Sequence, residues 1–294
     1  MSNRLEEIKN RILSIDDLPT LPSVATEVMK LTQDPDTSLN DLVEVILNDP
    51  SITTKILKIA NSAFYGMRSK IDTIRRALVV LGMNEVGSLV ATISVFSTFP
   101  IRSNYETFDR KKFWEHCSVT GEIAKAISQK LGLKLGGVAF TAGLLHDIGK
   151  IILDQYFHDQ FLEAYMASVD NGTPLIEEER RVFGVTHEQV GGWLGEKWKL
   201  PQNLIDPILY HHKPIRSFEN KTLTAIISLS NIFAKACDES FGGEHLKIII
   251  SDTSAWKILL REIPDIQNID LEKFTFELFE YSKNAKDFVE VVAG

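Results

Sequence analysis

Cysteine is scarce in this chain of 294 residues, and its two copies, Cys117 and Cys237, lie far apart and outside any Cys-x-x-Cys pattern. A disulfide framework and a zinc ribbon both need more cysteines at closer spacing, so the sequence argues against both. Unpaired thiols fit a reducing compartment, and we expect a cytoplasmic protein. The first 17 residues are charged and amphipathic, without the apolar segment and cleavage site of a signal peptide.

Positive charge is also in short supply. Lys and Arg total 32 against 40 Asp and Glu, which gives a formal net charge of −8 at pH 7. A chain of this sign has no overall attraction for the phosphates of nucleic acid or for an anionic membrane surface. We therefore expect neither as a partner. Nor do we find an apolar stretch that reaches the ~20 residues of a membrane span.

Strand-like segments are nearly absent. Only residues 247–251 are rich enough in β-branched side chains to form a short strand, while helical periodicity dominates the rest. The pattern predicts an all-α fold. A polar segment at residues 100–105, opened by Pro100 and placed between two strongly helical stretches, is the best candidate for a domain boundary.

Local signals place several helix ends. Ser38, with Asp41 three residues later, predicts an N-cap pair, and Gly82 predicts the end of one helix before the next begins. Pro207 lies inside a helix predicted over residues 203–212 and should kink it. One uninterrupted helix is predicted over residues 138–157.

That helix contains the most unusual stretch of the chain, Gly143-Leu-Leu-His146-Asp147-Ile-Gly149-Lys150. Burying a neutral polar group costs roughly 2–7 kcal/mol unless something satisfies it. Adjacent helical residues point about 100° apart, so His146 and Asp147 could lie on either side of one ion. Lys150 follows His146 by one turn, where its ammonium could meet an anion bound at that ion. The alternative is a buried histidine that bonds to a carbonyl beside a capping aspartate.

The other histidines favour the ion. Six of the seven fall in one half of the chain: His116, His146, His158, His187, His211 and His212. His116 shares a helix face with Thr120 and Ile123, and so points to the core. His158 lies in an exposed-looking segment and His245 lies outside this half, so we exclude both from the site.

The remaining side chains are enough ligands for two borderline metals such as iron, manganese or zinc, so we expect a divalent metal and a dinuclear site. Helical bundles hold such sites with ligands that project inward from facing helices. The alternative is that each histidine packs and hydrogen bonds separately. The predicted ligands are His116, His146, Asp147, His187, His211 and His212.

Several ungapped motifs over about residues 14–238 resemble the HDOD domain family, a group of signalling modules related to the HD phosphohydrolases. The matching segments, in the order that the family has them, are Leu18-Pro19-Thr20-Leu21-Pro22, Asp34-Pro35, Asn48-Asp49-Pro50-Ser51, Ala60-Asn61-Ser62-Ala63-Phe64-Tyr65-Gly66, Ala77-Leu78 to Leu81-Gly82, Phe113-Trp114 with His116, the His146-Asp147 motif, His187 with Val190-Gly191 and Trp193-Leu194, and Tyr210-His211-His212.

The resemblance implies an all-α architecture. An N-terminal helical lobe (residues 1–104) would pack on an HD-like helical lobe (residues 105–240), followed by a short C-terminal helical extension (residues 241–294). It also implies the same six metal ligands, because HD relatives with catalysis use a first histidine, a His-Asp doublet and further histidines.

Two departures from the HD hydrolases concern catalysis. Those enzymes have a final aspartate on a later helix, where this chain has Asn231, which can offer a neutral oxygen as a weak ligand only. The Gly-Tyr-Pro motif of cyclic-dinucleotide phosphodiesterases is absent, since Lys213 and Pro214 follow His212. HDOD proteins are usually thought to have lost catalysis, yet this chain retains much of the ligand set.

Three functions were weighed. We favour a non-catalytic regulator of the bacterial type, with a metal pocket in the HD-like lobe and a signalling protein as partner; the aromatic segment Phe64-Tyr65-Gly66 would lie near the junction of its lobes. The second is a metal-dependent phosphohydrolase, in which Lys150 holds the phosphate of a small phosphorylated ligand and no catalytic residue is otherwise assigned. The third is nucleic-acid binding through the helices of residues 39–61, against which Asp41, Glu44 and Asp49 argue.

Overall fold

The computed structural model describes residues 2–15, 18–62, 65–67, 69–100, 108–236, 249–270, 273–277 and 288–289, and the described residues form helices without any strand. The all-α prediction is therefore confirmed. The α-helices are α1 (Ser2–Leu13), α2 (Ser23–Leu31), α3 (Leu39–Leu47), α4 (Pro50–Ala60), α5 (Ile74–Leu81), α6 (Met83–Thr98), α7 (Arg110–Lys130), α8 (Gly136–Leu145), α9 (Ile148–Tyr156), α10 (His158–Asn171), α11 (Leu175–Val182), α12 (His187–Lys197), α13 (Gln202–Tyr210), α14 (Lys221–Ala236) and α15 (Ser254–Glu262). Short 3-10 helices cover Pro214–Arg216, Ile250–Asp252 and Pro264–Asn268.

Side-chain caps set the ends of the early helices. At the start of α3, Ser38 Oγ accepts from Asp41 N at 3.3 Å while Asp41 Oδ2 accepts from Ser38 N at 2.8 Å, which is the predicted reciprocal cap. Asp49 Oδ1 caps α4 by accepting from Ser51 N and Ile52 N. Gly82 separates α5 from α6 with a φ of 93°, a conformation that side chains with a Cβ rarely adopt.

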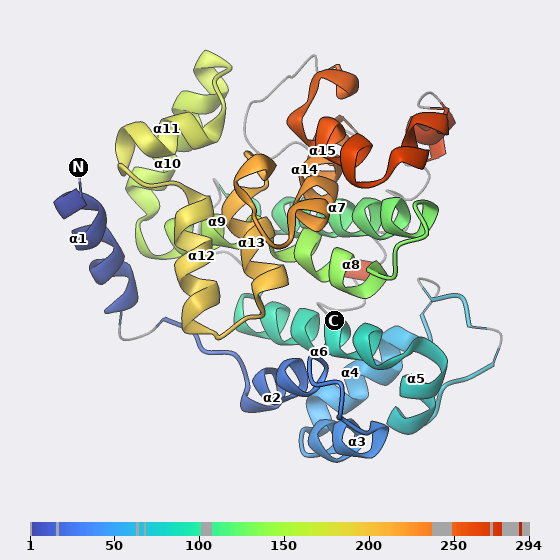
Figure 1. The fold of residues 1–294 in the computed structure, drawn as a ribbon. Helices are drawn as coiled ribbons and strands as arrows, with labels where there is room; N and C mark the ends of the chain where they lie inside the picture. The colour runs from blue at the N-terminus through green and yellow to red at the C-terminus, as the bar shows by residue number, and fades with distance from the viewer. Residues whose placement is uncertain are drawn as a thin grey trace.

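Helix α6 lies at the centre of the arrangement (Figure 1). The short helices α2, α4 and α5 pack on one side of it, and α8 packs on the other. Beyond α8, helices α7, α13 and α14 complete a bundle, while α12 packs on α9 and α13. Helices α7 and α14, which lie far apart in the sequence, also pack on each other.

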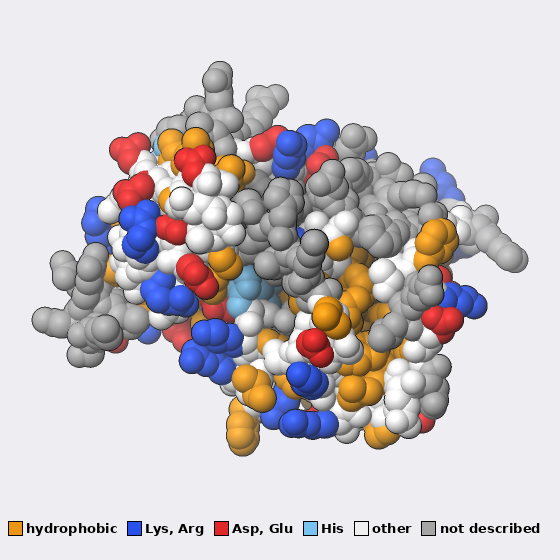
Figure 2. Space-filling model, turned by 90° about the horizontal axis from the view of Figure 1, so that it is seen from above, with side chains coloured by type: hydrophobic (Ala, Val, Ile, Leu, Met, Phe, Trp, Pro, Cys, Tyr) orange, Lys and Arg blue, Asp and Glu red, His pale blue; other side chains and the backbone are white. Residues whose placement is uncertain are grey.

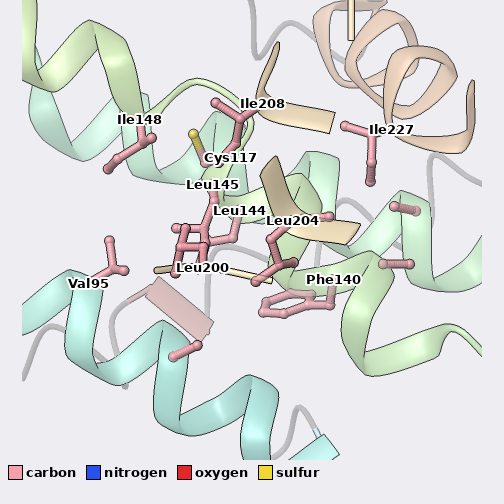
Figure 3. Packing of buried hydrophobic residues seen from close by; sticks show 14 of the residues in the cluster. Val95, Cys117, Phe140, Leu144, Leu145, Ile148, Leu200, Leu204, Ile208 and Ile227 are labelled. Carbon is pink, nitrogen blue, oxygen red and sulfur yellow. The ribbon is translucent and has the colours of Figure 1, made fainter. Parts of the chain in front are cut away.

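One apolar core runs through these layers. Figure 3 shows Val95 of α6 facing Leu144 and Leu145 of α8, with Leu204 and Ile208 of α13 beside them. Each of these side chains is no more than 6% exposed. Burying an aliphatic side chain of this size contributes about 1.5–3 kcal/mol, so the contact between the α6 and α8 layers is a large part of the stability of the fold.

Helix α1 packs outside the N-terminal helices. It contacts α12, where Lys197 Nζ donates to Leu13 O at 3.3 Å, and the chain that follows it is held by Trp198 Nε1, which donates to Pro19 O at 2.8 Å. The residue ranges expected for the two lobes stay a prediction, and residues 101–107 of the expected boundary lie outside the described residues.

Two local predictions were wrong. The helix predicted over residues 138–157 is broken at His146 and Asp147, between α8 and α9. Both α8 and α9 are rich in apolar residues, so the hydrophobic periodicity of the sequence does not indicate the break between them. Of the predicted strand, residues 249–251 are described, and residues 250 and 251 belong to a 3-10 helix. β-branched residues form a strand only where a partner strand pairs with them.

The segment Gly136–Tyr156, which spans the break, is long and apolar enough to cross a membrane by length and composition, contrary to the expectation from the sequence. However, 89% of its apolar window is buried inside the protein. Helices α5 and α6 pass the same test only when joined across a bend of 119°. The length of Gly136–Tyr156 therefore reflects its place in the core of the helical bundle.

Close helix approach at Gly149 generates a prediction. An added Cβ there would overlap His187 O and lie 2.7 Å from Gly191 N, both backbone atoms of α12. We expect Gly149→Ala to lower the free energy of unfolding by about 1–3 kcal/mol, as overpacking does. Gly136→Ala is the matched control, because its Cβ would meet only Lys125 Cγ at 3.9 Å. Chemical denaturation measures both, and equal stability of the two variants would contradict the proposed role of Gly149.

Candidate metal centre

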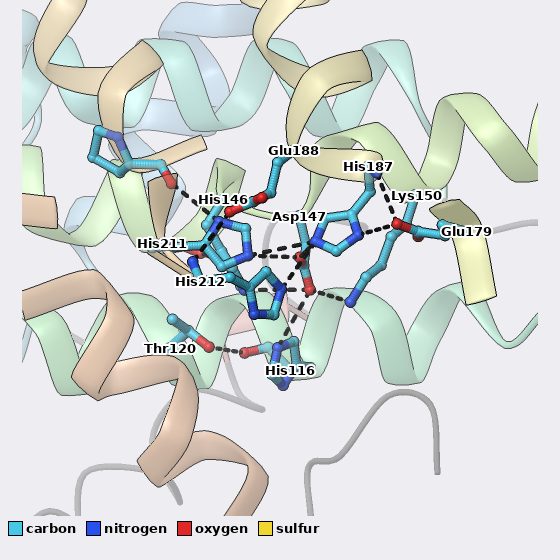
Figure 4. Close-up of polar contacts among 12 residues, drawn as sticks. His116, Thr120, His146, Asp147, Lys150, Glu179, His187, Glu188, His211 and His212 are labelled. Carbon is cyan, nitrogen blue, oxygen red and sulfur yellow. Dashed lines mark hydrogen bonds and ion pairs between the residues drawn. The ribbon is translucent and has the colours of Figure 1, made fainter. Parts of the chain in front are cut away.

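The six predicted ligands lie together in one cluster (Figure 4), although they come from four separate parts of the chain. His116 lies on α7, and His146 and Asp147 occupy the break between α8 and α9. His187 is the first residue of α12, and His211 and His212 follow the end of α13. Five of the six are at most 1% exposed, while His212 is partly exposed. The structure brings the six residues together, and their binding of a metal remains a prediction.

The Asp147 carboxylate is the centre of the cluster. Its Oδ2 lies 3.3 Å from His146 Nε2 and 3.6 Å from His116 Nε2. Its Oδ1 lies 3.2 Å from His187 Nε2 and 3.5 Å from His211 Nε2. The two oxygens therefore face two different pairs of imidazoles.

His212 completes the group on the Oδ1 side. Its Nε2 lies 3.2 Å from His187 Nε2, which in turn is 3.5 Å from His211 Nε2. Donor atoms on each side lie within 4.8 Å of one another, so two sets with a shared carboxylate could each hold an ion. One set is His116, His146 and Asp147, and the other is Asp147, His187, His211 and His212.

Hydrogen bonds at the far nitrogens orient three of the rings. His146 Nδ1 is 2.6 Å from Gly143 O, and His211 Nδ1 is 3.0 Å from Pro207 O. A carbonyl oxygen can only accept, so both rings carry a proton on Nδ1 and, when neutral, present the Nε2 lone pair to the centre. His187 Nδ1 is likewise 2.7 Å from Glu179 Oε2. This is the arrangement of metal-binding histidines, whose outer nitrogen donates to a carbonyl or a carboxylate.

Glu179 is a functional residue that sequence reasoning missed. It is fully buried on α11, and the same oxygen also accepts from His187 N at 2.8 Å. A signal was available, because Glu179 lies on the helix face that Leu175 and Phe183 define by spacing of four residues. An acidic residue within a buried apolar stripe needs a partner.

Burial and charge oppose each other in the pKa values of the site. Burial raises the pKa of Asp147, yet His146 and Lys150 hold that pKa well below its usual range. Burial lowers the pKa of His187, but the nearby negative charges of Glu179 and Asp147 together outweigh this and raise the pKa to about 9. Burial, then the neighbouring His146, lowers the pKa of His116 well below its usual value.

The Lys150 ammonium binds the Asp147 carboxylate, whereas the sequence predicted that it would lie beside a bound anion. Its Nζ donates to Asp147 Oδ2 at 2.6 Å, and the side chain is 3% exposed. The ammonium thus neutralises the carboxylate on the side of His146 and His116. A role for Lys150 toward phosphate would need this ion pair to open, so that role stays a prediction.

Helix α14 carries two further polar side chains that bear on this site. Asn231 is 5% exposed, and its Oδ1 has no hydrogen-bond partner within the described part of the chain. After burial and neighbouring histidines, the charge of Lys235 is among the causes that lower the pKa of His212 and of His116. Asn231 as a weak ligand remains a prediction, and Lys235 was not anticipated.

Of the two excluded histidines, His158 is described and lies apart from the cluster. His158 Nδ1 bonds to Asp154 Oδ1 at 2.9 Å, outside the cluster, and Asp154 also faces Arg110 at 3.4 Å. His245, Cys237 and Phe64 lie outside the described residues.

One residue of the cluster is partly exposed at the surface. Figure 2 shows a histidine side chain at the surface, beside basic and acidic side chains. Among the six cluster residues, only His212 is not fully buried. An ion or small ligand would therefore enter on the side of His212.

A model of the HDOD domain family matches residues 18–214, about two thirds of the chain. The chain belongs to the HDOD domain family. An HDOD domain protein of unknown function from Geobacter sulfurreducens has the same fold, with a TM-score of 0.83, 22% identity and coverage of 99% of this chain and 98% of that one. A protein from Shewanella amazonensis SB2B, whose name proposes a phosphohydrolase, gives a TM-score of 0.71 at 22% identity, with 96% and 97% covered.

An uncharacterized protein of Treponema pallidum (strain Nichols) is 26% identical over 226 residues, which are 76% of this chain. The chain spans only 43% of that relative's length. For this HDOD domain, the resemblance seen in the sequence is confirmed, and the solved structures support the fold.

The bond between His187 and Glu179 can be tested in metal-free protein. We expect Glu179→Gln to lower the pKa of His187 from about 9, because the largest influence that raises it is lost while burial remains. Histidine-detected NMR titration of chelator-treated protein measures this pKa. Glu178→Gln is the control, since Glu178 bonds to Thr173 and Arg181. An unchanged His187 pKa in Glu179→Gln would show that another group protonates this ring.

Proposed function

We propose that this HDOD domain is a regulatory module that holds a divalent metal on Asp147 and its histidines and acts through a protein partner, without hydrolytic turnover. The observation that supports it best is the convergence of imidazole Nε2 atoms on both oxygens of one buried carboxylate. When an imidazole ring is neutral and its proton is on Nδ1, its Nε2 lone pair faces the negative charge of the Asp147 carboxylate. Such an arrangement is unfavourable unless protons or cations lie between them.

The unsatisfied atoms of the site fit an ion. Asp147 Oδ1 and His146 Nε2 are buried without a hydrogen-bond partner among the described residues. Leaving a buried polar atom unsatisfied costs about 1–3 kcal/mol, more when it is charged. Imidazole nitrogens with a carboxylate oxygen suit zinc, iron or manganese. A metal bound here would act as a Lewis acid toward a bound oxygen ligand, and the protein would orient that ligand.

The two halves of the site are unequal. Three imidazoles surround Asp147 Oδ1, whereas Asp147 Oδ2 already bonds to the ammonium of Lys150 at 2.6 Å. A cation on the Oδ2 side would compete with Lys150 for the same oxygen. We therefore propose tight binding of one metal by Asp147, His187, His211 and His212, and weak binding of a second by His116, His146 and Asp147.

The weak second half supports a regulator over an enzyme. Two divalent ions a few Å apart repel each other, and each additional carboxylate offsets part of that repulsion. Asp147 is the only carboxylate within both ligand sets, and Asn231 stands where the resemblance places an aspartate in catalytic relatives. With few negative ligands, a second ion is poorly held.

A phosphohydrolase acting on a nucleotide or other phosphoester is the second candidate. Lys150 and Lys235 place two positive charges around the histidines, as a phosphate would require. The name of the Shewanella relative points the same way. In this case the phosphorylated ligand would approach on the side of His212, which is the partly exposed residue of the cluster.

A protein partner has a suitable surface on the N-terminal helices. Leu47 of α3 is 54% exposed, and Val79 and Val80 of α5 are 68% and 49% exposed. Because α3 and α5 pack on each other, these apolar side chains are carried by adjacent helices, as at protein–protein interfaces. We place the protein in the cytoplasm, where unpaired cysteines persist.

Removing the central carboxylate tests the metal site. We expect Asp147→Ala to lose bound metal and to be destabilised by about 3–5 kcal/mol, because the buried ammonium of Lys150 loses its partner. Elemental analysis and chemical denaturation measure the two effects. Asp159→Ala, at an exposed position on α10, is the control. Unchanged metal content in Asp147→Ala would show that metal binds elsewhere.

Restoring a carboxylate tests the proposed lack of catalysis. We expect one metal per wild-type chain and two per Asn231→Asp chain, since the added charge offsets the repulsion between ions. Asn231→Leu, without an oxygen ligand, should keep one. Metal stoichiometry is measured together with hydrolysis of a generic phosphodiester and of cyclic dinucleotides. Robust turnover by the wild type would make the phosphohydrolase the better proposal, and equal stoichiometry in all three proteins would remove Asn231 from the site.

A further inference from the structure

A cavity of about 500 Å³ lies away from the histidines, at the junction where α2 and α6 face α8 and α13. Its walls include Gln33 just after α2, Asn84 and Ser88 of α6, Thr141 of α8 and Asn203 of α13. Gly87 allows α6 to approach the end of α2 closely, since an added Cβ on Gly87 would lie 2.6 Å from Thr32 Cγ2. The volume is within the range of small-molecule sites.

The lining has a distinctive chemistry. It includes three carboxamides (Gln33, Asn84 and Asn203), hydroxyl groups, a partly apolar floor, and one cation, Lys134, but no carboxylate. A metal ion or an amine would find no negative charge, and a polyanion would find only one positive charge. The lining therefore selects a neutral or singly phosphorylated ligand with many hydrogen-bonding edges.

Two of the amides have unused capacity. Asn203 Oδ1 is buried without a hydrogen-bond partner among the described residues. Asn84 is exposed at the mouth of the cavity, and no hydrogen bond of its side chain to the described residues is found. Carboxamides pair their oxygen and NH₂ with the adjacent donor and acceptor of a nucleobase edge.

We propose that this cavity binds a nucleoside monophosphate, with the base held by the amides of Asn84 and Asn203 and the phosphate by Lys134. The apolar floor, which includes Leu135 and Val138, would cover a face of the base. This site is separate from the metal centre and has its own lining. Its ligand would be the signal that the regulatory module detects.

The cavity and the metal centre share two helices. Thr141 of α8 lies five residues before His146, and Leu204 of α13 lies seven residues before His211. At a rise of about 1.5 Å per residue, the two sites are separated by only roughly 8–10 Å along rigid helices. A ligand that shifts α8 or α13 therefore changes the positions of metal ligands, and the two binding events should be coupled reciprocally. This coupling rests on the proposed metal site, whereas nucleotide binding does not.

Isothermal titration of the full chain tests the proposal. The probes are the monophosphates of adenosine, guanosine, cytidine and uridine, the four nucleosides, and inorganic phosphate. We expect at least one monophosphate to bind in the micromolar range, its nucleoside about two- to fivefold more weakly, and phosphate alone not at all. Absence of binding by all four monophosphates at millimolar concentration would overturn the proposal.

Variants locate the binding. Asn203→Leu and Asn84→Leu should each weaken binding about tenfold, and Asn84→Leu, at an exposed position, keeps the test valid if the first variant fails to fold. Lys134→Met should weaken monophosphate binding only, leaving the nucleoside unchanged. Asn10→Leu on α1 and Lys112→Met on α7 are the matched controls. Equal affinities in cavity variants and controls would place the ligand elsewhere.

Repeating the titration with chelator-treated and zinc-supplemented protein tests the coupling. We expect the dissociation constant of the monophosphate to differ between the chelator-treated and the zinc-supplemented protein. Nucleotide binding that is the same in both would reject the coupling and leave the cavity assignment standing, so failure of the metal proposal and of the nucleotide proposal can be distinguished.

Discussion

The burial of one carboxylate, that of Asp147, is the constraint on which the rest of the site depends. A fully buried negative charge is costly unless positive or hydrogen-bonding groups surround it. Here Lys150 satisfies one oxygen, while His187 and His211 lie nearest to the other. Four helices must converge on this point, and Glu179 must in turn support His187. The stability of the bundle and the chemistry of the site are thus coupled at a single residue.

Convergence requires backbones to approach more closely than ordinary side chains allow. Gly121 of α7 and Gly143 of α8 lie against each other, so that an added Cβ on Gly143 would be 2.6 Å from Gly121 Cα. This crossing brings His116 beside His146. Gly149 and Gly191 serve the same purpose between α9 and α12, which carries His187. The small residues near the His-Asp motif are therefore packing requirements that determine where the ligands lie.

The asymmetry of Asp147 connects the site to a regulatory role. One oxygen is surrounded by histidines and lacks a hydrogen-bond partner among the described residues, while the other is already bonded to a lysine of the protein. A centre of this kind favours one ion and discourages the pair that phosphoester hydrolysis by two metals needs. Helices α8 and α13 extend from this centre to the polar cavity under α6. The regulation that we propose through those helices would depend on the same packing that stabilises the fold.

Sequence alone determined the features that depend on local or repeated patterns. The all-α fold, the cap formed by Ser38 and Asp41, and a helix that contains Pro207 follow from helical periodicity and from residues a few positions apart, whereas the kink expected at Pro207 stays a prediction. The clustered ligands were predictable because a histidine on an apolar face requires a partner, and five of the six histidines in one half of the chain lie around the same carboxylate, that of Asp147.

Only tertiary structure decided how those residues meet. The break between α8 and α9 depends on packing around Gly143 and Gly149, which an apolar pattern does not reveal. The pairing of Lys150 with Asp147 Oδ2, the oxygen that also faces His146 and His116, depends on how α9 is placed against α7 and α12. Glu179 and the cavity at Asn203 arise from helices that are distant in sequence. Contacts of this kind have no local signature, because they are set by the crossing of helices and not by the residues on either side of them in the chain.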